Sequence, residues 1–207
     1  MAKRPQVTEI KRRIPRQTRA TETVAAILEA ATQILEAGGL DAFTTNAVAE
    51  RAGVSIGTLY QYFADKDALL RAVAQRELKA TLANVARVLA DEGGTPEQRV
   101  RGVVRAIINA FHGRLRARRA VVQAVISQTG GQAFHGPVAA FIAANSLATI
   151  EPHQTFVLSR AFLGAIRSAV LEEQSLLKSR SFEDEVVRLI LAYLGALNAL
   201  PPSTAPA

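Results

Sequence analysis

The sequence predicts an all-α protein of about nine helices. Apolar residues recur at helical spacing, and helix-start and helix-stop residues follow one another from about residue 20 to residue 199, whereas strand patterns are almost absent. Hydrophobic residues make up 49% of the 207 residues, which is enough to bury a sizeable core. We therefore expect a folded protein built from packed helices.

Four helices are predicted in the first 91 residues. Gly38 and Gly39 follow an apolar stripe and should end the first helix, while Ser55 and Asp65 can cap the third and fourth with their side chains. The fourth is the longest and is a natural bridge between two domains. The predicted ranges are about 24–38, 44–53, 56–62 and 65–91.

Five more helices are predicted in the second half. The clearest start is at Thr95, where Pro96 stands at the first helical position and Gln98 completes a capping box. Pro152 and Ser181 mark two further starts, and the proline-rich end of the chain reads as a flexible tail over 201–207. The predicted ranges are about 95–112, 115–128, 137–150, 153–175 and 182–199.

The positive charge of the chain is concentrated at its amino-terminal end. Residues 1–19 hold seven basic residues and one acidic residue, a net +6 out of +7 for the whole chain. Such a segment is expected to be a disordered basic arm that attracts polyanions, and the alternative is a solubility tail. Between residues 20 and 67, by contrast, seven acids outnumber two bases. Attraction to a phosphate backbone would then come largely from the arm, including Arg16 and Arg19.

Composition and local patterns exclude several classes of protein. The chain has no cysteine, its start does not resemble a signal peptide, and no apolar run approaches the roughly 18–20 residues of a membrane-spanning helix. We therefore expect a cytoplasmic protein with no membrane partner. The three histidines lack metal-ligand spacing, and no cofactor motif is present, so neither a metal nor a cofactor is predicted.

The two short helices joined by Ala52-Gly53-Val54-Ser55 fit a helix-turn-helix, in which the second helix enters the major groove of DNA. Taken alone, this pattern also fits a plain corner between two helices. The residues from Thr44 to Leu70 are more specific, because Ala-Gly-Val-Ser-Ile-Gly-Thr-Leu-Tyr-Gln-Tyr-Phe, followed by Lys66 and Leu69, strongly resembles the signature of the TetR (tetracycline repressor) family. Ile27-Leu28-Glu29-Ala30-Ala31 also resembles that family's first helix.

The resemblance implies a DNA-binding domain over residues 20–80, with the helix-turn-helix at about 44–63. It further implies a regulatory and dimerisation domain over 81–200 and a homodimer on double-stranded operator DNA. Asn46 stands where many relatives carry arginine or lysine, so a base contact there would favour adenine. The residues that the resemblance places at or near DNA are Thr45, Asn46, Ser55, Ile56, Gly57, Thr58, Tyr60, Tyr62 and Lys66.

The last two predicted helices are apolar over more than one face, which favours coverage by a second subunit over burial within a monomer. Candidate interface residues are Ala161, Gly164, Ala165, Ser168, Ile190, Tyr193, Leu194 and Leu197. Few polar residues interrupt the helices of the second half, so we expect a small, largely apolar effector. Candidate effector-binding residues are Asn109, His112, Gln123, Asn145 and Arg167. The basic cluster Arg114 to Arg119 is expected to be a solvated turn and helix face.

The predicted function is a DNA-binding transcriptional regulator, a repressor released from a palindromic operator by its effector. The alternative is a helix-turn-helix protein that binds DNA without an effector. An enzyme is not expected, because the sequence lacks the common hydrolase and nucleotide-binding motifs. Ser175-Leu176-Leu177-Lys178 matches S-x-x-K of penicillin-binding proteins without its companion motifs, so it is a chance match.

Overall fold

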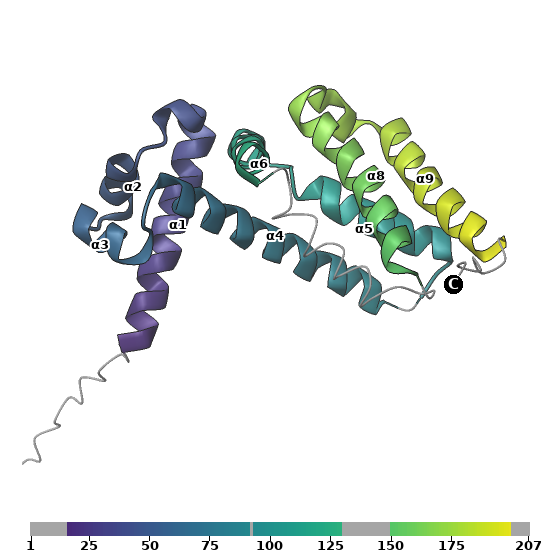
Figure 1. The fold of residues 1–207 in the computed structure, drawn as a ribbon, viewed down its shortest axis with the longest axis horizontal. Helices are drawn as coiled ribbons and strands as arrows, with labels where there is room; N and C mark the ends of the chain where they lie inside the picture. Colours follow the sequence, from purple (N-terminus) through teal and green to yellow (C-terminus); the bar gives the residue numbers. More distant parts are fainter. Residues whose placement is uncertain (1–15, 92, 130–149, 200–207) are drawn as a thin grey trace, which may run out of the picture.

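The computed structural model describes residues 16–91, 93–129 and 150–199 (Figure 1). These residues form eight α-helices and one short 3-10 helix, with no strand among them, which confirms the all-α prediction. The helix predicted at about 137–150 lies outside the described residues, together with most of the basic arm and the tail.

The amino-terminal part contains α1 (Arg16–Ala42), α2 (Thr45–Ala52), α3 (Ile56–Tyr62) and α4 (Lys66–Ala90). The first helix begins earlier than predicted, so residues 16–19 are helical and do not belong to a disordered arm. It continues to Ala42 across a kink at Gly39, where φ is 67° and the glycine adopts a conformation that other residues rarely reach. The predicted limits of the other three agree with the structure to within a residue or two.

The second half contains α5 (Pro96–Asn109), α6 (Leu115–Thr129), α8 (Pro152–Leu171) and α9 (Arg180–Ala199). The helix predicted to run to residue 175 instead ends at Leu171, and a 3-10 helix, η1 (Gln174–Lys178), follows it. One tertiary contact and one local effect account for this end. Arg119 donates a hydrogen bond to the Leu171 carbonyl (2.9 Å), and Glu172 and Glu173 place negative charge where the helix dipole is already negative.

The helices pack around two hydrophobic cores. The first joins buried residues of α1, α2, α3 and the first half of α4 with the buried face of α6. The second joins α5, α8, α9 and η1. Figure 1 shows α2 and α3 at one end of the molecule, α8 and α9 side by side at the other, and α4 running between them. The sixth helix, although it comes late in the sequence, therefore completes the core of the amino-terminal part.

Candidate DNA-binding helices and internal cavity

The turn between α2 and α3 is fixed by local hydrogen bonds. Gly53 ends α2 with φ of 67°, and its N–H bonds the carbonyls of Ala49 and Glu50. Ser55 Oγ then accepts from the Thr58 N–H (3.0 Å) and begins α3. Both caps were predicted, because glycine is favoured in left-handed backbone and serine at a helix start.

One face of α3 is anchored in the core and the opposite face is open. Leu59 is fully buried, and Phe63 just after the helix is also buried. On the other side, the exposed fractions are 38% for Ile56, 50% for Tyr60 and 38% for Tyr62. Large apolar and aromatic side chains on a rigid, exposed helix are available to a partner, because the chain itself does not cover them.

Hydroxyl groups line the same exposed surface. The hydroxyls of Thr45 and Tyr60 are 3.2 Å apart, which ties α2 to α3, and those of Ser55 and Thr58 are 2.8 Å apart. Asn46 is exposed beside Thr45 on α2. Such hydroxyl and amide groups can donate to phosphate or contact base edges.

Gly57 is not required by the packing of the chain. Its φ is not positive, and a Cβ added there would find its nearest neighbour, Ser55 Oγ, 3.8 Å away. The missing side chain therefore leaves free space on the outer face of α3, which suits the close approach of another molecule.

The basic residues expected near DNA differ in their surroundings. Arg19 is exposed on α1, and Arg16 forms the start of that helix. Lys66 is already engaged within the chain: its Nζ donates to the Leu40 carbonyl (3.4 Å) and lies 5.8 Å from the centre of the Phe43 ring. Contact between Lys66 and phosphate would therefore share or replace these weak contacts.

A cavity of about 130 Å³ lies between the two cores, enclosed by α4, α5, α6 and α8. This volume is many times the roughly 10–15 Å³ that one water molecule needs. The lining is mostly apolar; Ala74 and Val121 belong to the first core, and Ile166 and Val170 to the second. The polar or charged residues in the lining are Glu77, Thr81, Arg118 and Arg167.

Only one of the five predicted effector residues lines this cavity, namely Arg167. Asn109, His112 and Gln123 are exposed and lie outside the lining, and Asn145 lies outside the described residues. These three were chosen as polar residues in apolar helices, without regard to the face that each occupies, so they stay a prediction that this cavity does not support. Sequence reasoning also missed Glu77, Thr81 and Arg118.

The basic cluster Arg114 to Arg119 was predicted to be solvated, but two of its arginines are paired with acids of other helices. Arg114 donates two hydrogen bonds to Glu29 of α1 (2.8 and 3.1 Å), and this ion pair lowers the pKa of Glu29, although partial burial opposes the shift. Arg118 donates two hydrogen bonds to Glu77 of α4 (2.9 and 3.0 Å). The cluster therefore holds α6 to α1 and α4.

A second set of ion pairs holds α5 to the start of α9. Burial raises the pKa of Glu183, but hydrogen bonds from Arg105 and Arg101 outweigh it, so the pKa lies below its usual value. Hydrogen bonding to Arg101 also lowers the pKa of Asp184. These groups stabilise the carboxy-terminal part in their ionised forms.

The predicted interface residues are distributed over both exposed and buried positions. Ala161 of α8 is exposed, whereas Ile190 of α9 is buried in the core of its own chain and offers little surface to a second subunit. Tyr193 and Leu194 pack partly against that core. The half-buried candidates are Gly164, Ala165, Ser168, Tyr193, Leu194 and Leu197.

The most exposed large apolar residues of this end are not among the predicted interface residues. Phe156 and Val157 of α8 and Leu189 of α9 have exposed fractions of 52%, 50% and 42%. Arg160 lies over the Phe156 ring at 3.4 Å from its centre.

Three further features bear on other kinds of site. Within the described ranges, no three histidine, aspartate or glutamate side chains are placed to hold a metal ion. No described helix is long and apolar enough to span a membrane. Ser175 of the S-x-x-K match donates to Glu173 and lies in η1.

Comparisons with known proteins agree with the geometry of α1 to α4. Residues 27–73 match the family described as bacterial regulatory proteins, tetR family. The chain is 45% identical over 78 residues to the transcriptional repressor KstR of Mycolicibacterium smegmatis and 37% identical over 82 residues to the transcriptional regulator BetI of Burkholderia thailandensis. These matches cover 38% and 40% of this chain, and 38% and 42% of the relatives.

Solved structures extend the likeness to the whole fold. A TetR transcriptional regulator from Rhodococcus sp. RHA1 superposes with a TM-score of 0.63 at 21% identity, covering 86% of this chain and 97% of that one. The repressor FadR of Thermus thermophilus, crystallised with lauroyl-CoA, gives 0.61 at 17% identity, covering 89% and 99%. Residues 27–73 therefore belong to the tetR family of bacterial regulatory proteins, and the chain as described has the fold of solved TetR transcriptional regulators.

Proposed function

We propose that this protein is a transcriptional repressor that binds a near-palindromic operator as a homodimer and leaves it when a small, largely apolar molecule occupies the cavity. DNA binding is supported above all by the outer face of α3. Ile56, Tyr60 and Tyr62 are exposed there, beside Gly57, a glycine that the packing of the chain does not require. A helix held from behind and open in front can enter the major groove.

Attraction to DNA would come mainly from the amino-terminal arm. No charged residue lies within α3, and Lys66 at the start of α4 is engaged by Leu40 and Phe43. The basic residues of the first 19 positions precede and begin α1, which packs directly against α2. They can neutralise phosphates beside the groove without specifying sequence.

The partner that we propose for α8 and α9 is a second copy of the chain. Two adjacent helices expose large apolar side chains, Phe156 and Val157 on α8 and Leu189 on α9, and a two-fold axis would cover them with the same residues of a second subunit. Leu189→Glu should convert a dimer into a monomer in sedimentation velocity. Ala83→Glu, which places the same charge on the exposed side of α4, should leave the dimer intact.

Support for an effector comes from the cavity and from related folds. The lining joins α4, which follows the DNA-binding helices directly, to helices of both cores. Two proteins with this fold were crystallised with bound molecules: FadR with lauroyl-CoA and EbrR with ethidium. A hundredfold loss of operator affinity would require about 2.7 kcal/mol of coupling between the two sites.

The proposal is tested by selecting DNA bound by the purified protein from a random pool and measuring affinity by fluorescence anisotropy. We expect a two-fold symmetric consensus and at least tenfold weaker binding by Tyr60→Ala. Failure to enrich any sequence would contradict the proposal. A library of apolar compounds then decides the alternative, because a protein without an effector would keep its operator affinity with every compound.

A further inference from the structure

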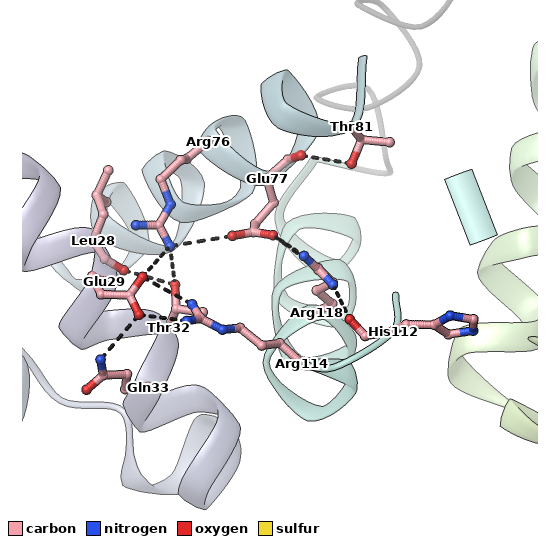
Figure 2. Close-up of polar contacts among 10 residues, drawn as sticks. All are labelled: Leu28, Glu29, Thr32, Gln33, Arg76, Glu77, Thr81, His112, Arg114 and Arg118. Carbon is pink, nitrogen blue, oxygen red and sulfur yellow. Dashed lines mark hydrogen bonds and ion pairs between the residues drawn. The ribbon is translucent and has the colours of Figure 1, made fainter. Parts of the chain in front are cut away.

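A network of ion pairs runs from the cavity wall to the DNA-binding helices. We define it as Glu29, Arg76, Glu77, Arg114 and Arg118, and Figure 2 shows these side chains converging from α1, α4 and the start of α6. The network joins residues that are up to 85 positions apart in the sequence. It is therefore a tertiary connection and not a local feature of one helix.

At the cavity end, Arg118 donates to Glu77 Oε2 through both Nε (3.0 Å) and Nη2 (2.9 Å). Both residues line the cavity, and each side chain is 22% exposed. Arg167 lines the same cavity from α8, and its guanidinium makes no ion pair or hydrogen bond with the residues that the structure describes. The described lining thus carries two guanidinium groups and one carboxylate, an excess of one positive charge.

At the other end, the network holds α1. Arg76 of α4 donates to Thr32 Oγ1 (2.6 Å) and lies 3.7 Å from Glu29 Oε2, while it also lies 3.4 Å from Glu77 Oε1. Arg76 is thus shared between an acid of its own helix and two groups of α1. A change in how strongly Glu77 attracts Arg76 alters the bond between α4 and α1.

We infer that the effector is a monoanionic amphiphile, whose charged head binds Arg118 and Arg167 and whose apolar part occupies the cavity. This inference rests on the proposed function and adds the ligand class and the route of its effect. The head competes with Glu77 for Arg118, because one guanidinium cannot fully satisfy both carboxylates in the same direction. Glu77 then draws Arg76 away from Thr32 and Glu29, which loosens α1 from α4 and releases DNA.

The ligand class is tested with decanoate, decanol and decylamine as probes, using the full-length protein and isothermal titration calorimetry. Decanoate should bind at least about tenfold more tightly than decanol, because a hydrogen bond to a charged group contributes free energy on that scale. Decylamine should bind most weakly of the three. Arg167→Gln, at an exposed position, should remove most of this preference. Equal binding of the acid and the alcohol, or binding of none of the three, would overturn the inference.

The route is tested with Glu77→Gln, which keeps the shape of the side chain and removes its charge. Because the neutral amide attracts Arg76 less than the carboxylate does, decanoate should lower the affinity of the unaltered protein for the selected DNA about tenfold, the scale of one charge-assisted bond, and should change the affinity of Glu77→Gln much less. Glu185→Gln, a matched change on the exposed face of α9, should lose DNA affinity with decanoate as the unaltered protein does. The same loss of DNA affinity with decanoate in Glu77→Gln as in the unaltered protein would overturn the route.

These outcomes separate the inference from the proposed function. A protein that selects no DNA contradicts the proposed function itself. A protein that binds its selected DNA, yet binds the acid and the alcohol equally, contradicts only the anionic class of effector. Circular dichroism melts of Arg167→Gln and Glu77→Gln identify a variant that does not fold, and Arg167→Gln tests the class even if Glu77→Gln is unstable.

Discussion

Two glycines four positions apart should respond in opposite ways to alanine, and the difference tests whether α3 meets DNA. In Gly57→Ala the new Cβ has 3.8 Å to its nearest neighbour, so it fits without strain. Alanine is also favoured over glycine within a helix by up to about 1 kcal/mol. The free protein should therefore be unchanged or more stable, by up to about 1 kcal/mol or roughly 2–4 °C in Tm for a chain of this size.

Gly53→Ala should do the reverse. With φ of 67°, alanine there costs about 1–2 kcal/mol, even though no atom lies within 4 Å of the new Cβ. On DNA, however, Gly57→Ala should be the more damaging change, because its methyl group stands between α3 and the groove. We expect at least a tenfold loss of affinity, or about 1.4 kcal/mol.

The assay pairs thermal unfolding with fluorescence anisotropy on the selected operator. Gly57→Ala should keep or gain stability and lose DNA affinity, whereas Gly53→Ala should lose stability. The two measurements together therefore separate contact with DNA from damage to the fold. Full operator affinity in Gly57→Ala would refute the close approach of α3 to DNA. A marked loss of stability in the same variant would instead refute our reading of the free space around Gly57.

Three further predictions follow from the same contacts. Deleting residues 1–15, which removes five bases and one acid while keeping α1 intact, should flatten the plot of log K against log salt and leave the selected sequence unchanged. Leu59→Ala, at a fully buried position, should lower the free energy of unfolding by about 2–5 kcal/mol in denaturant titrations. Three acids, Glu29, Glu183 and Asp184, have lower pKa values in the folded protein than in the unfolded chain. Their contribution to stability is therefore complete above about pH 4.5 and is lost as the pH falls through the lowered values. Unfolding followed by circular dichroism should show no loss of stability from this source between pH 8 and 5, and a decline below about pH 4.

The helix limits could be predicted because the signals that set them are local. Ser55, Asp65 and Thr95 each accept a hydrogen bond from a backbone N–H three residues later, and Gly53 takes the left-handed conformation expected after a helix. Such signals need no knowledge of the rest of the fold. The end of α8 could not be predicted in this way, because the bond from Arg119 to Leu171 joins residues 52 positions apart.

Most of the cavity residues could not be picked out from the sequence, although some of them recur at helical spacing in α6. Arg118, Val122 and Ile126 are spaced by four, so they share one face of α6, and Gln123 lies about 100° away from that face. Asn109 is likewise off the stripe of Ile107 and Phe111. The periodicity was available, but which stripe meets a cavity depends on how α4, α5, α6 and α8 pack together, and those contacts are tertiary.

The packing of α6 explains why a cavity in the second half can affect helices at the other end of the molecule. Val121 is 4% exposed and belongs to the same core as Leu59, which anchors α3, yet it also lines the cavity. Ala74 of α4 has the same double role. Because close-packed side chains yield little to a new neighbour, a molecule that displaces Val121 or Ala74 must also shift the residues behind them, and those residues set the position of α3. The ion pairs and the packing thus bias the same helices, so substitutions that fill the cavity, such as Ala74→Val, should weaken operator binding without any ligand.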